Sequence, residues 1–140
     1  MTMMMLLSAV TVAACVAPIA WFEVAYLLFG ATGADPGGAV DLAVAFATFV
    51  GSVGWSLHGA RRPAQVVRNG CRAGIALSIA LPVVTIAVLL LWLSADDRPD
   101  LGMGGLMLYS MPVVAVIAAI VLVVLFTIVR DLASRRLAHD

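Results

Sequence analysis

The chain has 140 residues, of which 64% are hydrophobic and only 11% are charged, and its mean hydropathy is +1.12. This composition excludes an ordinary soluble domain, because so much apolar surface would aggregate in water. We therefore expect an all-α integral membrane protein, with lipid as the solvent for most of its surface. The formal net charge of zero carries no information about the orientation in the membrane. The positions of the charges along the chain do.

Four apolar segments are long enough to cross a bilayer. They are Met5 to Phe29, Val40 to His58, Cys71 to Leu93 and Leu106 to Val129. At ~1.5 Å of rise per residue, each can span a hydrocarbon core of ~30 Å. We predict four transmembrane helices in an antiparallel, up-and-down bundle that forms one domain over residues 1–140. Residues 130–140 are expected to be a cytoplasmic tail that prolongs the fourth helix.

The connecting segments differ sharply in charge. Residues 30–41 and 94–105 are acidic and rich in Gly and Pro, whereas residues 59–72 and the tail hold seven of the eight arginines, leaving Arg98 alone on the other side. Basic residues near helix ends are retained on the cytoplasmic side during insertion. Both termini are therefore predicted to be cytoplasmic. The absence of lysine is typical of a GC-rich bacterial genome, so the inner (plasma) membrane is the expected location.

Small residues recur at four-residue intervals on two of the predicted helices. They are Ala43, Ala47 and Gly51 on the second helix, and Gly70, Gly74 and Ser78 on the third. Helices in lipid associate through close backbone approach, because no hydrophobic force brings them together there. We expect these two faces to pack against each other or against a neighbouring subunit.

Glu23, the only glutamate in the chain, lies inside the first apolar segment. It falls about six residues outward from the middle of that segment, so it should lie within the outer half of the hydrocarbon core. Holding the carboxyl group in its ionised form there is costly. The cost is avoided if the group is protonated, pairs with a basic residue or contacts water. Tyr26, one turn on, could donate a hydrogen bond, and Arg98 is the nearest basic candidate. Glu23, Tyr26 and Trp21 are the candidate proton or solute site. The alternative is a tolerated carboxylate that reaches the interface beside the two aromatic rings or pairs with a helix of another protein.

The stretch AWFEVAY, residues 20–26, resembles the first helix of the small multidrug resistance exporters. In that family a glutamate of the first helix is the shared site for protons and cations. The resemblance implies the same role for Glu23. It covers seven residues, and the acidic outer loops and strong arginine bias of this chain depart from the family's short connections.

Three functional classes remain open. The composition and the small-residue faces favour a non-catalytic accessory or structural subunit of a membrane assembly. The first alternative is an oligomeric, proton-coupled carrier or channel for a small cationic or amphipathic solute that uses Glu23. The second is a membrane-embedded enzyme that acts on a lipid. His58, His139, Cys15 and Cys71 lie at unrelated depths, so no metal site, cofactor or catalytic residue is expected. The expected partners are the bilayer and another copy or a larger membrane protein, with no nucleic acid.

Overall fold

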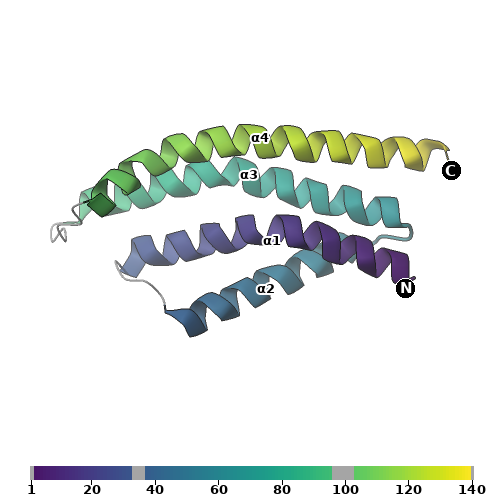
Figure 1. Cartoon of the computed structure of the whole chain (residues 1–140), viewed down its shortest axis with the longest axis horizontal. Coiled ribbons are helices and arrows are strands. Elements are labelled where there is room, and N and C mark those ends of the chain that lie inside the picture. The colour runs from purple at the N-terminus through teal and green to yellow at the C-terminus, as the bar shows by residue number, and fades with distance from the viewer. Residues whose placement is uncertain (1, 33–36, 96–102, 140) are drawn as a thin grey trace.

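The computed structural model of the chain describes residues 2–32, 37–95 and 103–139, and all of its regular elements are helices. They are α1 (Met3–Thr32), α2 (Gly38–Leu57), α3 (Pro63–Ser94) and α4 (Met103–His139) (Figure 1). Each helix is long enough to cross a membrane, and each contains a stretch that is apolar enough to do so. The helices continue through Pro18, Pro82 and Pro112.

All four helices begin before the apolar segments that predict them, and α3 and α4 extend furthest beyond those segments. The third begins at Pro63 rather than at Cys71, so the connector expected over residues 59–72 is a loop only as far as Arg62. Proline suits this first turn, because its fixed φ fits a helix and no hydrogen bond is lost. The fourth helix has 37 residues and continues to His139. The length of an apolar segment predicts how much of a helix lies in lipid. The helix itself can continue into polar residues for as long as its backbone hydrogen bonds continue.

The turn between α2 and α3 is closed by a side chain from α3. Gly59 adopts a φ of 66°, a left-handed conformation that glycine tolerates without a Cβ clash. The side-chain amide of Asn69 donates hydrogen bonds to the backbone carbonyls of His58, at 3.0 Å, and Ser56, at 3.4 Å. These carbonyls belong to the end of α2, where helical partners run out. Asn69 therefore holds the start of α3 against the end of α2.

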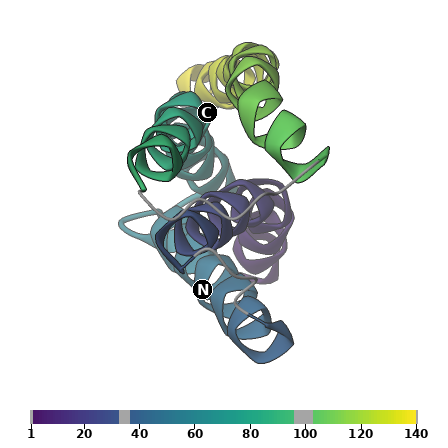
Figure 2. The same ribbon diagram turned by 90° about the vertical axis from the view of Figure 1, so that its left-hand side faces the viewer.

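The four helices form an open row rather than a closed ring. Seen from one end, the order is α4, α3, α1, α2 (Figure 2). α3 contacts both α1 and α4, and α2 contacts α1 and, less extensively, α3. Among the described residues, no Cα of α4 lies within 8 Å of α1 or α2. One side of the row is consequently an opening between α1 and α4 with α3 as its floor.

The core lies mainly along the α1/α3 seam. One buried cluster joins Met5 and Ala9 of α1 to Val66 of α3, and a second joins Val16, Cys71 and Phe126. Glycines let the helices approach closely in this seam. A Cβ on Gly70 would collide with Val12, and one on Gly30 would lie 2.7 Å from a methyl of Val88. The seam thus depends on two positions where no side chain is present.

Candidate functional site

Glu23 faces the interior of the helix row. It belongs to a series at seven-residue intervals, two helical turns apart, that also holds Ala9, Val16 and Gly30. Ala9 clusters with Val66, and Gly30 approaches Val88, so this face of α1 runs along α3. Because side chains seven residues apart share one face of a helix, Glu23 also points into the seam. This explains why its side chain is only 6% exposed.

The carboxyl group of Glu23 is buried, and its Oε1 has no hydrogen-bond partner among the residues that the structure describes. Val16 clusters with Cys71, and Gly30 approaches Val88, so Glu23, halfway between them, lies at the level of Ser78 to Leu81. The Ser78 hydroxyl donates to the carbonyl of Gly74 in its own helix, at 2.6 Å. No salt bridge to Glu23 exists among the described residues, and Arg98, the basic partner considered from the sequence, lies outside them.

Trp21 and Tyr26 do not converge on Glu23. The Tyr26 ring stacks on Phe22 of its own helix, with the centroids 5.5 Å apart, and it contacts Phe29 at 6.5 Å. Its hydroxyl has no hydrogen-bond partner within residues 2–32, 37–95 and 103–139, so the bond to Glu23 that the spacing allows is not made. Trp21 lines a cavity of about 250 Å³ between α1 and α2. The three candidates therefore share a helix and a level but point to different neighbours.

The two small-residue faces have different surroundings. Gly70, Gly74 and Ser78 of α3 are buried, with Gly70 against Val12 and Ser56 and Gly74 against Phe126. Ala43, Ala47 and Gly51 of α2 are exposed, and a Cβ on Gly51 would meet no atom within 4 Å. The two faces therefore do not meet within the chain. The face of α3 is used for internal packing by α1, α2 and α4 instead.

A second feature lies at the opposite end of the seam from Glu23, where α1, α3 and α4 line an open, mainly apolar cavity of about 450 Å³. Sequence reasoning did not find it. Its lining comes from three helices, and no local pattern in any one of them marks a shared surface. Arg135 and Arg136 border an adjoining cavity toward the end of α4.

These features define a class of protein: four helices that are each long and apolar enough to span a bilayer make this a multi-pass membrane protein. No protein family, curated protein or solved structure matches the chain. The likeness of residues 20–26 to the small multidrug resistance exporters therefore stays a prediction about seven residues.

Proposed function

We propose that the four helices cross a bacterial plasma membrane in antiparallel order, with both termini in the cytoplasm. The arginine bias supports this orientation, since basic residues near helix ends are retained on the cytoplasmic side. Both chain ends and the turn between α2 and α3, which carries Arg61 and Arg62, lie at the same end of the molecule (Figure 1). Glu23 then belongs to the half of the membrane away from the cytoplasm.

Within this membrane, we propose that the protein is a non-catalytic accessory or structural subunit of a larger assembly. The observation that carries this proposal is the exposed small-residue face of α2, defined by Ala43, Ala47 and Gly51 and called here the outer face of α2; its Gly51 end borders an open cavity of about 450 Å³ that Val16 and Ala73 also line. This face has the small-residue spacing that lets helix backbones approach closely in lipid. It is exposed in the single chain, and nothing lies within 4 Å of a Cβ placed on Gly51. A helix of another subunit can therefore pack there without disturbing the chain's own fold.

The test is isolation of the tagged protein in a mild detergent, with mass measurement of the complex and identification of its components. Gly51→Leu should release a co-purifying subunit, because leucine blocks the close approach of a second backbone. Gly105→Leu in α4 is the matched control, since a Cβ on Gly105 would also meet no atom within 4 Å and this residue lies outside the outer face of α2. If the wild-type chain purifies alone, or both variants retain the subunit equally, the accessory role is wrong.

A second function is favoured by Glu23, whose buried Oε1 has no hydrogen-bond partner. Ionisable side chains inside a membrane are costly and commonly mark proton or ion pathways. A carrier or channel that exchanges protons for a cationic or amphipathic solute would use this carboxyl group as its binding site.

Glu23→Gln separates the two functions, because glutamine keeps the shape of the side chain and cannot carry the charge or exchange a proton. The carrier function predicts that this variant abolishes solute-driven proton flux in proteoliposomes while its membrane abundance is unchanged. The accessory function predicts unchanged subunit retention in Glu23→Gln and loss of retention in Gly51→Leu. Retention lost in Glu23→Gln alone would contradict both assignments.

A further inference from the structure

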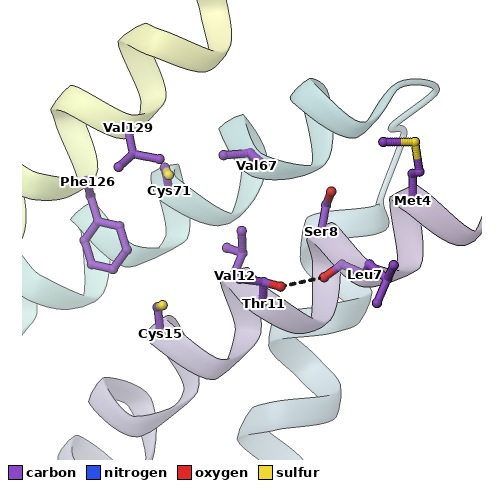
Figure 3. Close-up of a pocket in the computed structure, with 10 residues that line it drawn as sticks. All are labelled: Met4, Leu7, Ser8, Thr11, Val12, Cys15, Val67, Cys71, Phe126 and Val129. Carbon is purple, nitrogen blue, oxygen red and sulfur yellow. Dashed lines mark hydrogen bonds between the residues drawn. The ribbon is translucent and has the colours of Figure 1, made fainter.

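The opening between α1 and α4 is a continuous groove. Its inner part is the cavity of about 450 Å³ whose ten lining side chains are labelled in Figure 3. Its outer part is a second cavity of about 800 Å³, toward the end of α4. Met4, Ser8, Val67 and Val129 line both cavities, so the two are joined. We call the joined space the α1/α4 groove.

The two ends of the α1/α4 groove have different chemistry. The inner end is lined by Val12, Cys15 and Phe126, where the Phe126 ring reaches down from α4 toward α1 (Figure 3). The ring can lie this deep because a Cβ on Gly74 of α3 would be only 2.7 Å from it. The outer end is bordered by Arg135 and Arg136. The groove therefore has an apolar interior and a cationic mouth.

The charges at the mouth are available to a ligand. Arg130, one turn deeper on α4, forms a salt bridge with Asp131 at 3.2 Å. Among residues 2–32, 37–95 and 103–139, neither Arg135 nor Arg136 has a carboxylate within the 4.0 Å that defines a salt bridge. Both side chains are exposed. An anion at the mouth would meet two guanidinium groups, which suit phosphate oxygens through paired hydrogen bonds.

The length of the groove matches one leaflet. Between Phe126 and Arg135, α4 makes two and a half turns, a rise of ~14 Å. Half of a hydrocarbon core is ~15 Å. A chain that starts at the arginine level and ends at the phenylalanine would therefore reach close to the middle of the bilayer. A partner helix fits less well, because it would cross both leaflets, whereas the two cavities are lined only from the level of Phe126 to that of Arg135 and Arg136.

We infer that the α1/α4 groove binds an anionic phospholipid of the cytoplasmic leaflet, with one acyl chain between α1 and α4 and the phosphate at Arg135 and Arg136. Basic pockets between helices on the cytoplasmic side suit anionic lipid headgroups. The bound acyl chain covers the side of α3 that α1 and α4 leave open. The site is distinct from Glu23 and from the outer face of α2, and it applies to an accessory subunit and to a carrier alike.

The headgroup contact is tested with the full chain in nanodiscs of equal phosphatidylglycerol and phosphatidylcholine. After gentle release, native mass spectrometry should show phosphatidylglycerol retained in preference to phosphatidylcholine. The double variant Arg135→Gln with Arg136→Gln should lower the affinity for phosphatidylglycerol about 30-fold, since each exposed ion pair with the bound phosphate is worth up to about 1 kcal/mol. Arg61→Gln with Arg62→Gln removes the same charge outside the groove and should leave retention unchanged. Equal retention of both lipids, or equal loss in both double variants, overturns the proposal.

The acyl-chain contact is tested with phosphatidylglycerol that carries a diazirine at the end of one chain. Illumination should attach it to peptides that contain Cys15 or Phe126, and Ser8→Phe should reduce that attachment by filling the groove. Attachment spread over α2 and the outer side of α4, or a second protein helix crosslinked in the groove, contradicts the assignment. Should Ser8→Phe fail to accumulate, the map of attachment in the wild-type chain decides the question by itself.

Discussion

The small-residue face of α3 and the outer face of α2 have the same kind of sequence pattern and opposite surroundings. Both present small residues at four-residue intervals, yet Gly70 and Gly74 are buried under Val12 and Phe126 whereas Gly51 has open space beside it. Small-residue spacing thus makes a helix face able to pack closely, but it does not determine which neighbour uses the face. That depends on where the other helices are placed, and here they leave one such face unused.

The largest expected effect that would sharpen this contrast is Gly70→Leu. Its Cβ would collide with Val12 and lie 2.8 Å from the Ser56 hydroxyl, so α1 and α2 must both shift. Overpacking of this kind costs ~3 kcal/mol of unfolding free energy. Unfolding by SDS titration in mixed micelles measures it. Gly51→Leu is the matched control and should not lower the free energy of unfolding, because its Cβ meets no described atom within 4 Å and leucine favours a helix over glycine by up to ~1 kcal/mol. Equal losses in both variants would break the distinction between the two faces.

A smaller effect of opposite sign is expected at Glu23. Because its buried Oε1 has no hydrogen-bond partner, Glu23→Leu should raise the free energy of unfolding by about 1–3 kcal/mol, the usual cost of an unsatisfied buried polar group. The same SDS titration reports it, with Glu23→Gln as the variant that keeps the polar group. A loss of stability in Glu23→Leu would mean that the carboxyl group has a stabilising partner in the seam.

The smallest effects are expected from alanine at two glycines. Gly30→Ala places a methyl 2.7 Å from Val88, whose branched side chain is stiff in a helix, so a loss of ~1 kcal/mol is expected. Gly51→Ala meets no atom and should instead gain up to ~1 kcal/mol through helix propensity. A loss of unfolding free energy in Gly30→Ala and a gain in Gly51→Ala would support the difference between the two helix faces. A gain in both variants would show that the Val88 side chain moves aside without cost.

The fold class could be predicted from the lengths of the apolar segments alone, since each membrane span is encoded by one continuous segment of sequence. The start of α3 could not, because Arg68, Asn69 and Arg72 are helical without being apolar. The inward direction of Glu23 was accessible from its seven-residue spacing to Val16 and Gly30. Its lack of a bond to Tyr26 was not, because that depends on the stacking of Tyr26 against Phe22. The α1/α4 groove depends on the placement of three helices, which no local pattern encodes.

The central claim is that the chain crosses the membrane four times with its arginine-rich end in the cytoplasm. The most direct measurement is labelling of single cysteines in a chain with Cys15→Ser and Cys71→Ala, using a membrane-impermeant maleimide. Ala31, at the end of α1, and His58, at the end of α2, are both exposed. Ala31→Cys should label in cells whose inner membrane is intact, and His58→Cys only after that membrane is opened. The reverse pattern, or labelling of both in intact cells, would contradict the orientation.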